Sequence, residues 1–152
     1  MMIKALALTA LLACVSGASA GQEGQIYLNF GGVSYHPGDK AGMLNGINPG
    51  LGLEYHRAGG DFIAAGLYHN SIGRSSRYAV YAKQVMAKGG VSLGVFGGVV
   101  DGYQWRDGGF IPFAAPYLSI TGDRAGVNLV FIPSVEKKVS SAIALQFKIR
   151  VF

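Results

Sequence analysis

The sequence predicts an all-β fold, an eight-stranded antiparallel transmembrane β-barrel, and three observations lead there. Half of the 152 residues are hydrophobic and 14% are charged, with a mean hydropathy of +0.32. This composition excludes intrinsic disorder, which requires low hydrophobicity and high charge. After the first twenty residues, no run of 18 apolar residues is present to cross a bilayer as a helix. Apolar and polar residues instead alternate with a period of two between glycine-rich breaks, in a chain whose length suits one domain.

The first twenty residues have the organisation of a secretory signal peptide. Lys4 supplies a short basic region, an apolar run follows, and an Ala-Ser-Ala cleavage site ends at Ala20. We expect residues 1–20 to be removed and residues 21–152 to form a barrel in the bacterial outer membrane. The alternative is cleavage before Cys14, where Leu-Leu-Ala-Cys is a loose lipobox, which would give a lipid-anchored protein. Cleavage after Ala20 removes the single cysteine and with it any disulfide.

Eight segments carry the alternation, and turn residues separate them. We expect strands near residues 24–35, 46–57, 61–71, 75–87, 91–103, 110–120, 124–133 and 140–152. Eight is the smallest even number of strands in bacterial outer-membrane barrels, and lengths of about ten residues suit a tilted crossing. The breaks hold turn-forming or charged residues, such as Pro37-Gly38-Asp39, Gly89-Gly90, Gly122-Asp123 and Glu136-Lys137-Lys138.

The last segment shows the two faces most clearly. One face carries Ile143, Leu145, Phe147, Ile149 and Val151, and the other carries Ala144, Gln146, Lys148 and Arg150. In a transmembrane barrel the apolar face meets lipid and the polar face meets the interior or the rim. A periplasmic barrel of the lipocalin kind is the alternative, although its outer face should carry more charge.

The same pattern assigns the faces of the other segments. The expected apolar sides are Ile26, Leu28 and Phe30 in the first segment, Leu51, Leu53 and Tyr55 in the second, and Val127, Leu129 and Phe131 in the seventh. In the fourth segment the apolar side is Tyr78, Val80 and Ala82, and the opposite, inner side is Arg77, Tyr81 and Lys83. Glu54 and His56 fall on an inner face and are expected to form a buried polar pair. Two segments are apolar on both faces, and their small residues are expected to leave room for a molecule inside: Ala64, Gly66, Gly94 and Gly98.

Charge and motif content narrow the possible partners. The formal net charge is +5 and the pI is about 9.4, but the basic residues are scattered, so we expect contact with membrane-lipid phosphates and no nucleic acid. Three histidines and one cysteine do not approach zinc-ligand spacing, and no phosphate-binding loop or dinucleotide fingerprint occurs. No metal or cofactor is expected, and the protein is expected to be a monomer.

Three prolines lie in or at the end of predicted strands. Pro112 and Pro116 interrupt the segment 110–120, and Pro133 ends the segment 124–133. Proline cannot donate a hydrogen bond to a neighbouring strand, so it opens a local gap through which a lipid chain could pass sideways. The alternative is that these prolines only mark strand ends near the rim.

Several short motifs follow one another between residues 50 and 152. They are Gly-Leu-Tyr-His-Asn-Ser at 66–71, Ser-Leu-Gly-Val-Phe-Gly-Gly-Val at 92–99, Phe-Ile-Pro at 110–112 and again at 131–133, and Phe-x-x-x-x-Phe at 147–152. The series resembles the lipid A palmitoyltransferase (PagP) family of eight-stranded outer-membrane enzymes. The resemblance implies transfer of a palmitoyl chain from a phospholipid to lipid A by a His, an Asp and a Ser near the outer rim. It also places Pro112, Pro116 and Pro133 where strands part for lateral lipid entry.

The resemblance selects candidate site residues and shows where this chain departs. Asn70 stands at the position of the family's aspartate, and Ser71 stands at the position of its serine. His36 corresponds to the family's histidine in or after the first strand, although the residues around it match the family only loosely. The amphipathic helix that precedes the family's first strand is missing.

The chemistry assigns these residues roles. Acyl transfer needs a base, for which histidine, with an unperturbed pKa of about 6.5, is suited. His36 is the candidate base and His69 the second choice. Ser71 is a candidate nucleophile or oxyanion donor, and Asn70 can orient a histidine but cannot act as a base.

Other readings remain open for the same residues. Arg74 and Arg77 are candidate ligands for lipid phosphates. Both histidines can instead be rim residues in the headgroup layer, and Ser71 can be a turn residue. For the whole protein the alternatives are a non-catalytic outer-membrane barrel, with a structural or surface role, and a lipid A or phospholipid esterase.

Overall fold

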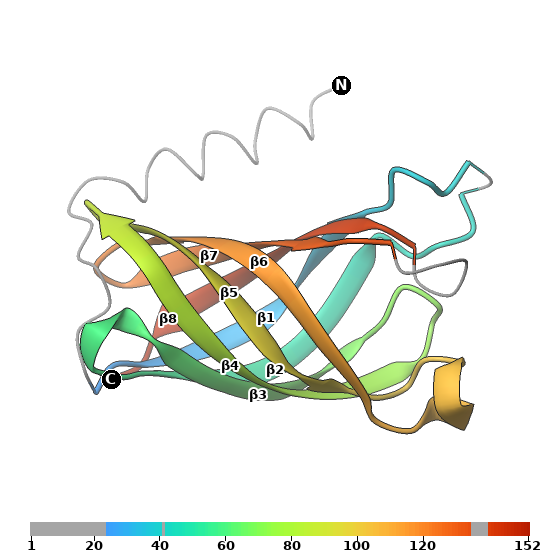
Figure 1. Cartoon of the computed structure of the whole chain (residues 1–152), viewed down its shortest axis with the longest axis horizontal. Coiled ribbons are helices and arrows are strands. Elements are labelled where there is room, and N and C mark those ends of the chain that lie inside the picture. Colours follow the sequence, from blue (N-terminus) through green and yellow to red (C-terminus); the bar gives the residue numbers. More distant parts are fainter. Residues whose placement is uncertain (1–23, 41, 135–139) are drawn as a thin grey trace.

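The chain forms a closed antiparallel barrel of eight strands, in which each strand pairs with its sequence neighbours and β8 returns to β1 (Figure 1). A computed structural model describes residues 24–40, 42–134 and 140–152. None of the helices in these residues is long and apolar enough to cross a membrane. The strands are β1 (Ile26–Tyr35), β2 (Ile47–His56), β3 (Phe62–His69), β4 (Ser75–Lys88), β5 (Val91–Val100), β6 (Ile111–Thr121), β7 (Ala125–Ile132) and β8 (Ala142–Arg150).

All eight predicted strands are confirmed in order, with ends that differ by at most three residues. The predicted segment 91–103 ends earlier, at Val100, because Gly102 adopts a positive φ of 84° and turns the chain. The predicted segment 61–71 ends at His69, and Asn70 and Ser71 therefore lie in the connection to β4. The predicted signal peptide, Cys14 and the segment 136–138 lie outside the described residues.

The two ends of the barrel differ in their connections. At one end, here the turn end, the strands are joined by short segments at 57–61, 89–90 and 122–124. The other end, here the loop end, has longer connections at 36–46 and 101–110, the second with a short 3-10 helix, η2 (Trp105–Gly108). The N-terminal end of β1 is tied to the C-terminus at the turn end, where the Ile26 amide donates to the Phe152 carbonyl (3.0 Å).

The outer surface is apolar, as the alternation predicts. Leu51 and Leu53 on β2 are 54% and 56% exposed, and the outward residues of β8 are exposed too. Ten of the exposed large apolar side chains come from the predicted outward positions: Phe30, Leu51, Leu53, Tyr55, Leu129, Phe131, Ile143, Phe147, Ile149 and Val151. Others, such as Ile63, Leu67, Val95 and Val99, lie on β3 and β5, whose faces the alternation did not assign.

The interior of the turn half holds a buried polar network. The side chains of Glu54 and Lys148 are fully buried, and Lys148 Nζ donates to Glu54 Oε1 at 2.5 Å. His56 Nε2 lies 2.5 Å from the same carboxylate, which confirms the predicted buried pair. Asn128 Nδ2 donates to Glu54 Oε2 (2.9 Å), and Lys148 Nζ also donates to Ser119 Oγ (3.1 Å). Each charge is thus paired and hydrogen-bonded, the condition under which buried ions are tolerated.

Strand β4 is turned the other way round from the prediction. Val80 and Ala82 face the interior, whereas Arg77, Tyr81 and Lys83 face outward. The prediction placed Arg77, Tyr81 and Lys83 on the inner face, which is wrong for a physical reason. Arg77 and Lys83 lie toward opposite ends of the strand and pair with carboxylates of the adjoining connections, so their charges need no polar interior.

The small interior residues make room for aromatic rings of the barrel itself. A Cβ atom on Gly52 or Gly66 would come within 2.4 or 2.9 Å of the Tyr78 hydroxyl. A Cβ atom on Gly94 would lie 2.7 Å from a ring carbon of Tyr117. At these positions the expected space for a foreign molecule is therefore occupied by tyrosine side chains, because interiors are close-packed.

Candidate functional site

The predicted site residues gather at the loop end. His36 follows β1, whereas His69 is the last residue of β3 and Asn70 and Ser71 follow it in the turn to β4. The two connections touch, since the Asn45 amide donates to the Ser71 carbonyl oxygen at 2.7 Å. The fold therefore brings residues from opposite sides of β2 to one part of the rim.

His36 takes part in a hydrogen-bonded chain with side chains of two strands. Its Nε2 lies 3.1 Å from Ser34 Oγ, and Ser34 Oγ donates to Asn48 Oδ1 at 2.6 Å. Asn48 Nδ2 in turn donates to the His69 carbonyl oxygen at 3.0 Å. The His36 ring is thus linked directly to Ser34 of β1, and through Ser34 and Asn48 to β2 and the end of β3.

Asn70 is fully buried and holds the β3–β4 turn in place. Its Oδ1 accepts hydrogen bonds from the backbone amides of Ile72 (3.1 Å) and Arg74 (2.9 Å). Its Nδ2 donates to Ser76 Oγ (2.9 Å) and to the Gly102 carbonyl oxygen (3.1 Å). The side chain uses both its donors and its acceptor in this way, and a carboxylate could not make the two donor contacts.

Arg77 lies on the outer surface near the rim and is held by the β5–β6 connection. Its guanidinium contacts the Asp101 carboxylate (2.6 Å) and lies 5.2 Å from the centre of the Phe110 ring. The Arg77 backbone amide and then its side chain lower the pKa of Asp101 below the usual range of a carboxyl group. Arg74 is exposed in the neighbouring turn, so both predicted phosphate ligands are at the loop end.

The predicted prolines lie where β6 and β7 separate. Pro112 and Pro116 are exposed on the outer face of β6, and Pro133 is exposed directly after β7. Of the residues described, only Tyr117–Thr121 of β6 pair with β7, although residues 111–116 pair normally with β5. Figure 1 shows β6 curving away from β7 toward the loop end. Residues 83–88 of β4 also pair on one side only, with β5, but they lie at the turn end. The separation of β6 from β7 is on the loop half of the barrel, where the predicted site residues lie.

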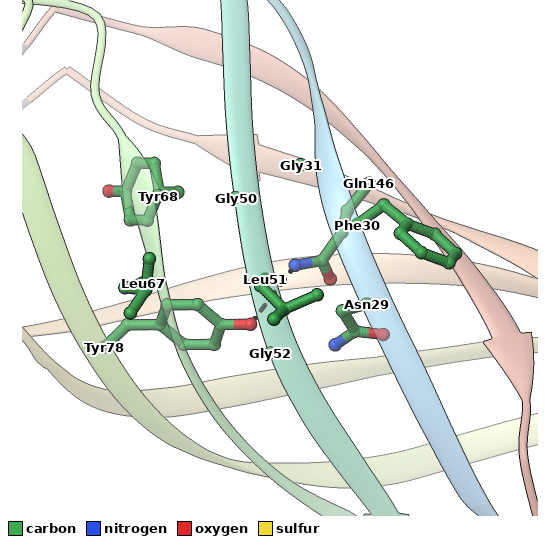
Figure 2. A pocket seen from close by; sticks show the side chains of 10 residues that line it. All are labelled: Asn29, Phe30, Gly31, Gly50, Leu51, Gly52, Leu67, Tyr68, Tyr78 and Gln146. Atoms are coloured by element: carbon green, nitrogen blue, oxygen red, sulfur yellow. Dashed lines mark hydrogen bonds between the residues drawn. The ribbon is translucent and has the colours of Figure 1, made fainter.

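A small pocket lies between β1, β2 and β3, next to the irregularity of β1 at Gly31. Figure 2 shows the Tyr78 side chain reaching past Gly52 toward Gln146. The Gln146 side-chain amide donates a hydrogen bond to the Tyr78 hydroxyl at 3.4 Å. The pocket measures about 10 Å³, close to the minimum for a single water molecule. It is therefore too small for an acyl chain.

Sequence reasoning did not assign a role to Ser34 or Asn48. The alternation of Ser34 and His36 along a strand places both side chains on one face, and this was the signal available. The partnership of Ser34 with Asn48 depends on the pairing of β1 with β2, which residue spacing does not reveal.

The described residues bring together no group of three or more His, Cys, Asp or Glu side chains that could hold a metal ion. A scan against protein-family models finds no match for the chain, and a search of curated proteins finds no significant similarity. Fold and site thus define a closed eight-stranded antiparallel β-barrel with an apolar outer surface and a polar rim. The likeness to the PagP family rests on the ordered motifs alone.

Proposed function

We propose that the protein is an integral barrel of the bacterial outer membrane. The support is the set of exposed large apolar side chains on the outer faces of β1 to β5, β7 and β8, since contiguous apolar patches larger than a few hundred Å² are rare on soluble monomers. Exposed aromatic residues lie near both ends, Tyr35 and Phe110 at the loop end and Tyr55, Tyr81 and Phe152 at the turn end, as in the aromatic girdles of such barrels. The longer connections then face outward and the short turns face the periplasm.

Cysteine labelling of intact cells tests this placement. The single native cysteine lies in the predicted signal peptide, so each engineered cysteine is the only one in the mature chain. Met43→Cys, in the exposed β1–β2 connection, should react with a membrane-impermeant maleimide. Leu53→Cys, on the apolar surface of β2, should react only after unfolding. Equal labelling of both in intact cells would contradict a membrane-embedded barrel.

We further propose that the protein transfers a fatty acyl chain from a phospholipid to lipid A at the loop end. The observation that carries this proposal is the separation of β6 from β7 beside Pro112 and Pro116, which offers a lateral path for a lipid chain. The half-buried inner side chains next to this separation, Phe113, Val130 and Ile132, form an apolar surface suited to hydrocarbon. Donor phospholipid and acceptor lipid A are then the partners, and the ordered motifs that resemble the PagP family point the same way.

The rim provides the groups that acyl transfer requires. His36 serves as the base that removes a proton from the acceptor hydroxyl, and Ser71 and His69 lie in the adjoining segment where the lipids meet. Arg74 and Arg77 supply positive charge for lipid phosphates, although Arg77 must share its guanidinium with Asp101. Asn70 contributes by holding the turn that carries Ser71.

Mass spectrometry of lipid A from a host that expresses the protein tests the reaction. Wild-type protein should produce a species that is heavier by one fatty acyl chain, and His36→Gln and Ser71→Ala should lose it while remaining folded in the outer membrane. Lipid A that is lighter by one chain would instead identify an esterase. Unchanged lipid A with folded wild-type protein would overturn the transfer reaction.

A non-catalytic barrel is the second candidate, and the role of Asn70 favours it. Where the resembled family has a catalytic aspartate, this chain has a buried side chain whose hydrogen bonds are all structural. In that case neither His36→Gln nor Ser71→Ala changes any lipid, and the protein serves as a surface component of the membrane.

A further inference from the structure

The hydrogen bonds around Ser34 determine which nitrogen of His36 carries a proton. Asn48 Nδ2 donates to the His69 carbonyl oxygen, so Asn48 Oδ1 is the atom that faces Ser34. The Ser34 hydroxyl has one proton, and its shortest contact, 2.6 Å, is to this oxygen. Ser34 Oγ is then left as an acceptor toward His36 Nε2 at 3.1 Å, so Nε2 is the protonated nitrogen.

The other ring nitrogen of His36 has no partner. Nδ1 is shielded from solvent and accepts no hydrogen bond from any described residue. An unpaired buried acceptor is unfavourable, and such groups in native structures commonly have a functional reason. A hydroxyl that donates to Nδ1 would satisfy it, once the atoms that cover it move aside.

We propose that Ser34 and Asn48 are positioning residues that hold His36 as the Nε2–H tautomer, with Nδ1 as the base that activates the acceptor hydroxyl. This inference rests on the proposed acyl transfer and deepens it. In a Ser-His-Asp triad a carboxylate holds the second nitrogen of the imidazole. Here the neutral Ser34–Asn48 pair does so, which removes the need for a carboxylate at position 70.

The reaction through Nδ1 balances without any further reactant. The acceptor hydroxyl gives its proton to Nδ1, and its oxygen attacks the carbonyl carbon of the phospholipid ester. The tetrahedral intermediate collapses with cleavage of the bond to the glycerol oxygen, and this oxygen takes the proton back from Nδ1. The products are the acylated acceptor and a lysophospholipid.

The charge that forms on the imidazole has a partner nearby. The Asp39 carboxylate accepts hydrogen bonds from the backbone amides of Leu44 (2.7 Å) and Met43 (3.1 Å). The Leu44 amide above all, and also the electrostatic interaction with His36, lower the pKa of Asp39. Asp39 is therefore ionised at neutral pH, and its backbone amide donates to the His36 carbonyl oxygen at 3.1 Å, so this negative charge lies in the same turn as the ring.

Nitrogen NMR of histidine-labelled protein tests the tautomer without relying on activity. The chain has only three histidines, and His36→Gln identifies the signals of His36 by their loss. At a pH at which the ring is neutral, we expect a protonated Nε2 and an unprotonated Nδ1. Ser34→Ala should give a mixture of tautomers, whereas Ser34→Thr, which keeps the hydroxyl, should retain the wild-type form.

Kinetics of the same variants test the catalytic part. Ser34→Ala should lower kcat by about 10- to 100-fold with little change in KM, as expected when a base is misplaced, and Ser34→Thr should restore most of it. A protonated Nδ1 in an active enzyme, or an unchanged tautomer and kcat in Ser34→Ala, would overturn this inference alone. The expected tautomer in a protein that transfers no acyl chain would overturn the proposed reaction and with it the role of Nδ1 as its base.

Discussion

The two halves of the barrel interior differ in what fills them. In the turn half, the inward side chains are fully buried and include two opposite charges, Glu54 and Lys148, with an aromatic cluster of Phe62, Phe96 and Tyr117 beside them. In the loop half, many inward residues are only half-buried and none of those on β5 to β8 is charged. The difference indicates that the close packing of the turn half stabilises the barrel, whereas the loop half keeps partly exposed inner side chains near the rim.

The largest effect is expected from breaking the charge pair of the turn half. Lys148→Met leaves the Glu54 carboxylate buried with only His56 and Asn128 as partners, and it should destabilise the barrel by about 3–5 kcal/mol. Urea-dependent unfolding in phospholipid vesicles, followed by circular dichroism, measures this. The double variant Glu54→Gln/Lys148→Met should recover much of the loss, and equal instability of both variants would contradict the pairing.

A matched pair of larger side chains compares the two interiors directly. Ala82 in the turn half is fully buried against the aromatic cluster, so Ala82→Leu should destabilise the barrel by about 1–3 kcal/mol. Ala144 in the loop half is half-buried, and Ala144→Leu should change the free energy of unfolding by less than about 1 kcal/mol. The same unfolding assay checks both, and a similar loss in the two variants would argue that the halves are packed alike.

The turn that carries Ser71 gives a smaller effect. Asn70→Asp keeps the acceptor for Ile72 and Arg74 but loses both donor contacts, and it sets a carboxylate against the Gly102 carbonyl oxygen. We expect a loss of stability of about 1–3 kcal/mol and no gain of acyl transfer. Asn45→Asp, in the neighbouring connection, is the comparison: it loses one donor contact, to the Ile47 carbonyl oxygen, at an exposed position, and should cost less than Asn70→Asp. A more active Asn70→Asp protein would show that this position belongs to the catalytic machinery.

The smallest expected effect is on the loss of stability at low pH, and it arises from carboxylates at the two ends of the barrel. At the turn end, hydrogen bonds from Tyr81 and Lys83 lower the pKa of Asp61 to about 2, against about 3.9 in an unfolded chain. Asp61 therefore stabilises the fold above about pH 4, and this contribution is lost as the pH falls toward 2. Asp101, whose pKa is also lowered, acts in the same direction at the loop end.

Comparison of the acid branch of the unfolding curve in Asp61→Asn and in wild type measures this contribution. The variant should show a shallower loss of stability between pH 4 and pH 2. The effect should be small because Lys83 is largely exposed and its charge is screened. A variant curve parallel to that of wild type would mean that Asp61 does not titrate with folding.

The sequence by itself determined the number, order and approximate ends of the strands. Strand alternation is a local property, and glycine, proline and charged residues mark the breaks, so β8 with its apolar Ile143, Phe147 and Ile149 could be assigned from residue types. The pairing of His56 with Glu54 was accessible for the same reason, since residues two apart share a face.

Only the tertiary structure decided the contacts between strands. Whether β4 turns Val80 or Tyr81 inward depends on the carboxylates that other connections supply for Arg77 and Lys83. The space next to Gly66 and Gly94 is occupied by Tyr78 and Tyr117 because the closed barrel brings those rings across the interior. Barrel closure likewise joins Lys148 to Glu54, ninety-four residues apart, and the pairing of β1 with β2 places Asn48 beside Ser34 and so decides how His36 is held.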